Sequence, residues 1–400
     1  MISLRALRAA AVLAMTLVPA LATAQTRTID VRGLERWLRR VADSAGFSGV
    51  VLVERGGKVV LEHAYTPTGA RALTTQSAFW IGSTTKQFTA AAIMRLVDEG
   101  KLAVTDSLYH FFRSAPRRAR AITIEQLLTH TSGLDAAGAA NGIGDRDAAV
   151  RAILAEPVRD APGASYHNAG EDYNVLAAIV EQVSGKPFEA FVERALLIPA
   201  GLARTGFCGR MSPNVKLAPS AQRAVPPPCS AGVTPVDWAD RGATGLVSTA
   251  ADLLKWTHAI RSDRLLAAAS QRELERGHAF MRPEGDGEMY YGFGARVYME
   301  GQRRREVSLS GYDVRVGHSS AVRVMDSGLT IVVLSNAGLD ARGQAWAGEI
   351  ARRLDGVLND ATTDERTIYQ PPSARPSTAP AQTSRRLPLR ISTSLTSRPR

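Results

Sequence analysis

The chain has 400 residues, 45% hydrophobic content and a formal net charge of +11 at pH 7. The hydrophobic content is enough for a large core, and the chain is too long for one minimal domain. Residues 371–400 contain six arginines and no acid, and Arg5 and Arg8 lie at the other end, so the two ends supply most of the charge. The charge therefore does not indicate a nucleic-acid interface.

The first 24 residues have the pattern of a leader peptide. Arg5 and Arg8 precede an apolar run over residues 9–21, and Ala22-Thr23-Ala24 is a small-x-small cleavage pattern. The run is too short for an ordinary membrane span, and no Cys follows it to carry a lipid. We expect cleavage before Gln25, a periplasmic or secreted location, and no stable membrane insertion after the leader is removed.

Residues 359–400 are rich in Pro, Ser, Thr and Arg and predict a disordered tail, which leaves residues 25–358 for the folded domain.

The two cysteines, Cys208 and Cys229, flank a proline-rich stretch. An even count is compatible with one disulfide in an oxidising compartment, and two free, packed cysteines are the alternative. Neither has histidine at ligand spacing, so we expect no metal site.

The elements predicted along the chain run in the order strands, helices, strands, helix. A short helix at 34–45 precedes two strands at 50–54 and 58–62, joined by the hairpin signal Arg55-Gly56-Gly57. The following helices are expected at 83–99, 124–131, 147–155, 173–183, 187–197 and 250–261. Strands are expected again at 292–298, 320–325 and 329–334, and a closing helix at 341–358.

This order predicts a mixed α/β (α+β) fold. The sheet is antiparallel, is built from both ends of the chain and is flanked by N- and C-terminal helices, with a large helical subdomain inserted between its strands. A site is expected in the cleft where sheet and helical region meet. Ser83 opens the inserted region and therefore lies at that seam.

Ser83 and Lys86 are three residues apart at the start of the predicted helix at 83–99 and would share one face. A serine hydroxyl needs a base to take its proton, and a lysine removed from water can be that base. The spacing also arises by chance, and the alternative is an N-cap serine with a solvated lysine.

Five segments occur in the same order as in one known family. They are 81–86 (Ile-Gly-Ser-Thr-Thr-Lys), 122–134 (with Thr-His-Thr-Ser-Gly), 162–168 (Pro-Gly, then Tyr-His-Asn), 245–252 and 329–336. Together they resemble the serine beta-lactamase-related superfamily of class C type. That superfamily includes class C beta-lactamases, D-alanyl-D-alanine carboxypeptidases, D-aminopeptidases and esterases. The resemblance covers about residues 47–358 and implies a beta-lactamase/transpeptidase-like fold.

The resemblance implies a role for each matching residue. Ser83 corresponds to the nucleophile and Lys86 to its activating partner. Tyr166 and Asn168 correspond to a Tyr-x-Asn element, in which a phenol near a cation relays protons and an amide orients the substrate. The backbone N–H groups of Ser83 and of Tyr312, on an edge strand, would hold the oxyanion. No metal or organic cofactor is required.

Two departures from the family pattern concern the residues facing Ser83. The Lys-Thr-Gly or His-x-Gly element corresponds to Leu309-Ser310-Gly311, so Leu309 replaces a basic residue that helps to hold a substrate carboxylate. This favours an uncarboxylated ester or amide, with Arg315 or Arg323 as alternative sources of the cation.

The second departure is the register of the tyrosine. An ungapped alignment through Pro162-Gly163 and 173–176 places Asn168 at the tyrosine position. Aligning Tyr166 there needs a two-residue deletion before it and a two-residue insertion after Asn168. We prefer Tyr166, because Tyr-His-Asn keeps both functional side chains, and Tyr173 is the alternative.

Two further motifs are expected to be structural. His130 in Thr-His-Thr-Ser-Gly fits helix-end and turn chemistry. Gly317-His318-Ser319 imitates the nucleophile elbow of an α/β-hydrolase, but that fold needs a histidine after its serine and none follows His318.

The sequence therefore predicts an exported serine hydrolase that acts through an acyl-enzyme on a small ester or amide. A beta-lactamase or D-Ala-D-Ala carboxypeptidase, acting on a beta-lactam or a peptidoglycan fragment, is the second hypothesis. The third is a catalytically weak family member that binds cell-wall fragments.

Overall fold

The computed structural model describes residues 30–221, 237–313 and 315–359. The predicted leader at 1–24, Cys229 with its predicted pairing to Cys208, and all of the predicted tail except Asn359 lie outside these residues. Within the described part, no helix has both the length and the apolar character needed to cross a membrane.

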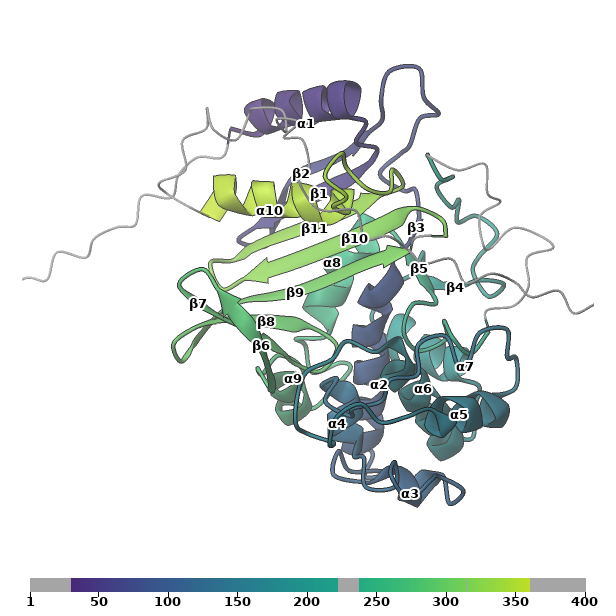
Figure 1. Cartoon of the computed structure of the whole chain (residues 1–400). Helices are drawn as coiled ribbons and strands as arrows, with labels where there is room; N and C mark the ends of the chain where they lie inside the picture. The colour runs from purple at the N-terminus through teal and green to yellow at the C-terminus, as the bar shows by residue number, and fades with distance from the viewer. Residues whose placement is uncertain (1–29, 222–236, 314, 360–400) are drawn as a thin grey trace, which may run out of the picture.

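The larger sheet has eight antiparallel strands in the order β2-β1-β11-β10-β9-β8-β7-β6 (Figure 1). Both ends of the chain contribute to its centre, because β1 pairs with β11 from Gly49 opposite Ser335 to Arg55 opposite Leu329. The predicted antiparallel sheet is thus confirmed. The bounds are β1 Gly49–Arg55, β2 Lys58–Tyr65, β6 Ala279–Glu284, β7 Gly287–Tyr291, β8 Arg296–Glu300, β9 Arg303–Asp313, β10 His318–Met325 and β11 Leu329–Ser335.

The hairpin that joins β1 and β2 is confirmed as well. The two strands pair antiparallel and are separated by Gly56 and Gly57, which have φ angles of 56° and 76°. A two-residue turn of this hand needs positive φ at both positions, which only glycine adopts readily.

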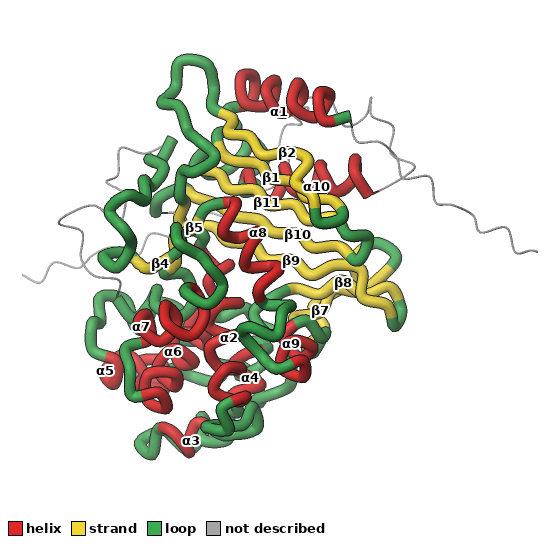
Figure 2. Tube along the Cα trace, turned by 180° about the vertical axis from the view of Figure 1, so that it is seen from behind, coloured by secondary structure: helices red, strands yellow, loops and turns green. Residues whose placement is uncertain are grey.

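Helices α1 (Val31–Ala45) and α10 (Trp346–Asn359) cover one face of the sheet (Figures 1 and 2). Along β1, Val51 and Val53 pack against these helices, whereas Val50 and Leu52 belong to the core on the other face. Successive side chains of a strand point to opposite faces, so β1 is apolar from Val50 to Val53 because both its faces are buried there.

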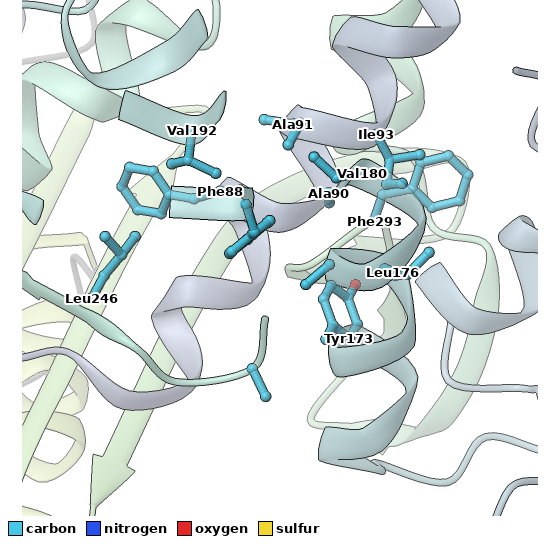
Figure 3. Packing of buried hydrophobic residues seen from close by; sticks show 14 of the residues in the cluster. Phe88, Ala90, Ala91, Ile93, Tyr173, Leu176, Val180, Val192, Leu246 and Phe293 are labelled. Atoms are coloured by element: carbon cyan, nitrogen blue, oxygen red, sulfur yellow. The ribbon is translucent and has the colours of Figure 1, made fainter. Parts of the chain in front are cut away.

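The inserted helical region covers the opposite face of the sheet (Figure 2). At its centre, α2 is buried on nearly every side, and its Phe88 and Ile93 pack in the core (Figure 3). Phe88 stacks on Trp256 with ring centroids 4.0 Å apart. The helices of this region are α2 Thr85–Asp98, α3 Leu108–Phe111, α4 Ile124–Leu128, α5 Arg146–Ala155, α6 Gly170–Ser184, α7 Phe188–Val192, α8 Ala250–Ala259 and α9 Ala268–Leu274.

A small second sheet connects the two parts of the molecule. It has the order β3-β5-β4, with β3 Phe79–Trp80, β4 Gly206–Phe207 and β5 Leu246–Ser248. β3 leads directly into a 3-10 turn, η1 (Gly82–Thr84), and η1 leads into α2. Ser83 therefore lies in this turn, two residues before α2 begins at Thr85, whereas the sequence predicts Ser83 at the start of the helix itself.

The structure differs from the predicted elements at several places. The predicted strand at 292–298 is a strand only from Arg296, because the preceding loop packs against α2: a Cβ at Gly294 would lie 2.7 Å from Cα of Gln87. The predicted helix at 187–197 divides into α7 and a π-helical turn, Glu193–Leu197. Strands β6 and β7 were not predicted, because they lie at the sheet edge and lack a clear apolar alternation.

Shortening Phe88 tests how much the core under Ser83 depends on α2. Phe88→Ala should lower the free energy of unfolding by about 3–5 kcal/mol, because it leaves a cavity beside Trp256. Urea unfolding followed by circular dichroism measures the effect. The control is Val59→Ala at a half-exposed position, and equal losses in both variants would contradict the placement of Phe88 in the core.

Candidate active site

The turn that carries Ser83 is fixed by hydrogen bonds from both sheets. Ser320 Oγ on β10 donates to the Ile81 carbonyl over 2.7 Å, and Trp80 N donates to His318 Nδ1 over 3.1 Å. Ile81 N donates to the Leu246 carbonyl of β5 over 3.0 Å. His318 thus supports the backbone before Ser83, and the structure gives it no place in a hydrolase elbow.

β9 passes against this turn at a distance that only glycine allows. A Cβ at Gly311 would lie 1.9 Å from the Ile81 carbonyl oxygen and 2.8 Å from Ser83 N. Gly82 has φ +54°, and a Cβ there would lie 2.8 Å from Tyr312 N. The N–H groups of Ser83 and Tyr312 therefore belong to two backbones in direct contact, which is the placement that the predicted oxyanion site needs.

β9 is not the edge strand expected for this site. It lies inside the sheet between β10 and β8, but the pairing with β8 ends at Ser308, opposite Arg296. Residues 309–313 therefore form a local edge without a strand partner on the side of β8. This open edge leaves backbone groups of β9 available beside Ser83.

Lys86 lies within hydrogen-bonding distance of Ser83. Its Nζ is 3.1 Å from Ser83 Oγ and 3.3 Å from Asn168 Oδ1, and its side chain is buried. Burial lowers the pKa of Lys86 to about 8, with Arg296 contributing in the same direction and Asp172 opposing it. A substantial fraction of the amine is therefore neutral near pH 8 and can accept the proton of the Ser83 hydroxyl.

Tyr166 and Tyr173 differ in their access to Ser83. Tyr166 lines a small cavity with Ser83 and Lys86. Tyr173 is fully buried and its hydroxyl donates to the Leu128 carbonyl over 2.7 Å, although its ring lies 5.8 Å from Lys86 Nζ (Figure 3). This geometry favours Tyr166 as the proton-relay residue and a core position for Tyr173.

The segment Leu309-Ser310-Gly311 presents its two larger side chains in different directions. Leu309 is 6% exposed and packs in the hydrophobic core, and it lines the cavities at Ser83 together with Ser310. Leu309 therefore offers nothing polar to a substrate, and Ser310 offers a hydroxyl.

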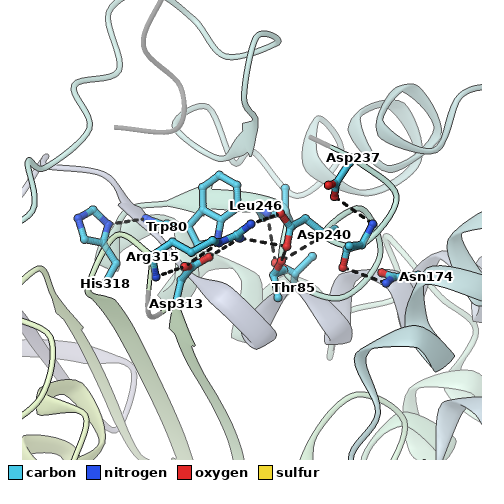
Figure 4. A network of polar contacts seen from close by, with 11 residues as sticks. Trp80, Thr85, Asn174, Asp237, Asp240, Leu246, Asp313, Arg315 and His318 are labelled. Atoms are coloured by element: carbon cyan, nitrogen blue, oxygen red, sulfur yellow. Dashed lines mark hydrogen bonds and ion pairs between the residues drawn. The ribbon is translucent and has the colours of Figure 1, made fainter. Parts of the chain in front are cut away.

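The two arginines considered as replacements for the missing cation are both engaged. Arg315 contacts Asp240 and Asp313, each over 2.6 Å, and ties the end of β9 to the helical region (Figure 4). Arg323 contacts Glu306 and Asp355. Neither guanidinium is free to hold a substrate anion.

His130 lies behind the site in a buried polar cluster. Its Nδ1 is 2.8 Å from Asp172, and Ser132 Oγ donates to the other oxygen of Asp172 over 2.5 Å. The residue has φ 57°, the one positive φ outside glycine in the described part of the chain. Burial holds the pKa of His130 well below its ordinary value, so the ring is neutral and packs beside Tyr166 and Tyr173.

A sequence model of the family described as Beta-lactamase matches residues 34–354. The chain belongs to the beta-lactamase family. The match includes Ser83, Lys86, Tyr166 and the open edge of β9. The family assignment that the five sequence segments predicted is thus confirmed.

Individual relatives of this beta-lactamase family member are distant in sequence. PbpX of Bacillus subtilis (strain 168) is 26% identical over 343 residues, which cover 84% of this chain and 80% of that protein. Esterase EstB of Burkholderia gladioli is 32% identical over 182 residues, covering 40% of this chain and 46% of the esterase. The octameric penicillin-binding protein homologue from Pyrococcus abyssi has a TM-score of 0.68 at 22% identity, over 83% of this chain and 78% of that one, which supports the fold.

Sequence reasoning missed two residues at the site of this family member. Arg296 at the start of β8 and Tyr291 at the end of β7 line the small cavity with Ser83 and Lys86. Neither belongs to a quoted motif, and their strands carry no strong pattern. The described residues contain no group of three or more His, Cys, Asp or Glu placed to hold a metal.

The contact between β9 and the turn of Ser83 predicts the effect of a single methyl group. Gly311→Ala should lower kcat by about 100-fold, because β9 must move away and take the Tyr312 N–H with it. The control is Gly356→Ala in α10, where an added Cβ meets nothing within 4 Å. Unchanged kcat in a folded Gly311→Ala protein would contradict this placement of the oxyanion site.

The pKa of Lys86 predicts the pH dependence of the reaction. Because the neutral amine is the base, kcat/KM should be low at acidic pH and rise through a midpoint near 8. The measurement uses an uncharged ester from mildly acidic to basic pH. A rise centred only at the ordinary pKa of lysine would show that Lys86 is solvated or is not the base.

Proposed function

We propose that this family member is an exported serine hydrolase that forms an acyl-enzyme on a small ester or amide. The observation that carries the proposal is the buried Lys86 amine, 3.1 Å from Ser83 Oγ, beside a backbone contact that aligns two N–H donors. The proposed base, nucleophile and charge-stabilising donors thus come from two separate parts of the chain, residues 83–86 and the end of β9.

In the proposed reaction, Ser83 Oγ attacks the carbonyl carbon while Lys86 takes the hydroxyl proton. The N–H groups of Ser83 and Tyr312 stabilise the negative oxygen that forms. The proton then passes to the leaving alcohol or amine, with Tyr166 as a relay, and the bond to the leaving group breaks. Water attacks the acyl-Ser83 ester in the same way, and Asn168 helps to hold Lys86 and the substrate.

The comparisons support a hydrolase, and we infer the class of substrate from this chain's own residues. One relative is named an esterase, and the solved structures of similar fold include proteins named as a D-stereospecific amidohydrolase and a hydrolase with promiscuous acyltransferase activity. Leu309 contributes no cation from β9 to a substrate carboxylate. An ester or amide is therefore our first candidate, with a beta-lactam or peptidoglycan fragment as the second.

The proposed periplasmic or secreted location follows from the leader pattern at 1–24. In that setting the hydrolase would meet small esters, amides and cell-wall fragments outside the cytoplasm. No metal or organic cofactor enters the proposed reaction, because the serine and lysine provide the nucleophile and the base.

Covalent labelling tests this proposal. The mature protein, treated separately with a fluorophosphonate and with a penicillin, should gain the mass of the fluorophosphonate adduct on the peptide that contains Ser83. Ser83→Ala should lose both this adduct and the turnover of short-chain p-nitrophenyl esters while keeping its thermal unfolding temperature.

The labelling outcomes separate the three hypotheses. A fluorophosphonate adduct without a penicillin adduct favours an esterase or amidase, whereas a penicillin adduct favours action on beta-lactams or cell-wall peptides. No adduct on the folded protein would overturn the hydrolase proposal and favour a binding member of the family.

A further inference from the structure

Four exposed arginines gather at one end of the molecule. They lie in residues 108–122, here called the arginine loop, which comprises α3 and the turns that follow it: Arg113, Arg117, Arg118 and Arg120. α3 lies at the end of the helical region opposite the large sheet (Figures 1 and 2). Residues 107–124 contain no acid, so the arginine loop carries positive charge alone.

The arginine loop is closed at its base and anchored on its inner side. Leu108 N donates to the Ile122 carbonyl over 2.7 Å, and Tyr109 N donates to the Arg120 carbonyl over 3.2 Å. Five apolar side chains of the loop are buried in the main hydrophobic core: Leu108, Phe111, Ala115, Ala119 and Ile122. The outer side therefore belongs to a loop that is already ordered, so a partner can bind it with little loss of conformational entropy.

Two of the arginines are arranged around an exposed aromatic ring. The guanidinium groups of Arg113 and Arg120 each lie 4.8 Å from the centroid of the Tyr109 ring, and Tyr109 is 38% exposed. The ring keeps two like charges at one exposed place, where an anion would offset their repulsion. Tyrosine and arginine each combine an apolar part with a polar end, which suits the boundary between water and lipid headgroups.

The charge of the other two arginines is not neutralised either. Arg118 donates to the carbonyls of Leu154 and Glu156 at the end of α5, each over 3.2 Å, but it forms no ion pair with a carboxylate of the described residues. Arg117 has no hydrogen bond, ion pair or ring contact within the part of the chain that the structure describes. The loop thus presents four guanidinium groups that an external anion can match.

We infer that the arginine loop attaches the protein to the surface of a membrane that contains anionic phospholipids. Lipid phosphates would bind the guanidinium groups, and the Tyr109 ring would lie among the headgroups. A membrane is favoured over a soluble polyanion because the exposed ring among the cations suits the headgroup boundary, which a soluble polymer does not offer. The contact is peripheral, so the protein would lie on the membrane without spanning it.

This attachment is independent of the reaction proposed for Ser83. α3 lies well away from β9, the strand that contacts the turn of Ser83 (Figure 1). A bound membrane would therefore leave the proposed active site uncovered, and the two properties can be measured separately.

Vesicle binding by the mature protein, residues 25–400, tests the inference. Sedimentation with sucrose-loaded vesicles gives the partition coefficient for phosphatidylcholine alone and for a two-to-one mixture of phosphatidylcholine and phosphatidylglycerol. The variant is Arg113→Gln/Arg117→Gln. The control, Arg71→Gln/Arg303→Gln, removes the same charge from two exposed arginines of the β2–β3 connection and of β9. All these proteins keep residues 371–400, so any binding by the arginines there is common to them.

The wild-type protein should bind the anionic vesicles and bind the neutral ones only weakly. Each arginine near an anionic surface contributes about 1 kcal/mol, so Arg113→Gln/Arg117→Gln should lower the partition coefficient by about 20- to 30-fold. The control should lower it by less than about 3-fold, because its charges lie far from the proposed contact. Arg113→Lys/Arg117→Lys, which keeps both charges, should stay within about 3-fold of the wild type. Added salt should weaken the binding of the wild type.

Hydrogen exchange locates the contact. With anionic vesicles, the backbone amides of residues 108–122 should exchange more slowly, whereas those around Arg71 and Arg303 should not change. Without vesicles, thermal unfolding and the turnover of short-chain p-nitrophenyl esters should be the same in the wild type and in all three variants. These two controls show that any loss of vesicle binding does not come from unfolding.

Four results would overturn the inference. They are the absence of binding to anionic vesicles, equal binding to neutral vesicles, equal losses in the two glutamine variants, and protection from exchange only outside residues 108–122. Binding to soluble polyphosphate without binding to vesicles would also overturn it and would favour an anionic polymer as the partner. Each of these results leaves the proposed function intact, because that proposal is tested by fluorophosphonate labelling at Ser83.

Discussion

The contact between β9 and the turn of Ser83 is the constraint on which the site depends. Gly311 meets the Ile81 carbonyl and Ser83 N so closely that no side chain fits between the two backbones. Hydrogen bonds from β10 and β5 hold the same turn from either side. The proposed nucleophile, Ser83, is therefore positioned by backbone packing, which is more rigid than an arrangement of mobile side chains.

Burial then gives this rigid turn its chemistry. Lys86 lies under the turn on α2, where loss of water favours the neutral amine, and Asn168 provides a hydrogen-bonding partner that carries no charge. Arg296 adds a positive charge nearby, which also lowers the pKa of Lys86.

Much of this architecture was accessible from the sequence, because it rests on local patterns. The hairpin of β1 and β2, the long helix after Ser83 and the family motifs are all contiguous in the chain. Arg296 and Tyr291 were not accessible, because only the folded sheet brings them to the cavity with Ser83 and Lys86. The edge strand β6 and its neighbour β7 were missed because half-exposed strands lack the apolar signal that buried strands show.

The pairing of β1 with β11 has a consequence for how the protein matures. Gly49 pairs with Ser335, so the centre of the sheet cannot form until residue 335 has been synthesised. The strand beside Ser83 is formed by residues 303–313. Such distant contacts form slowly and late. During synthesis from the N-terminus, Ser83 and Lys86 exist long before the strand that completes their surroundings. The surroundings of these two residues are therefore completed only when almost the whole chain has been made.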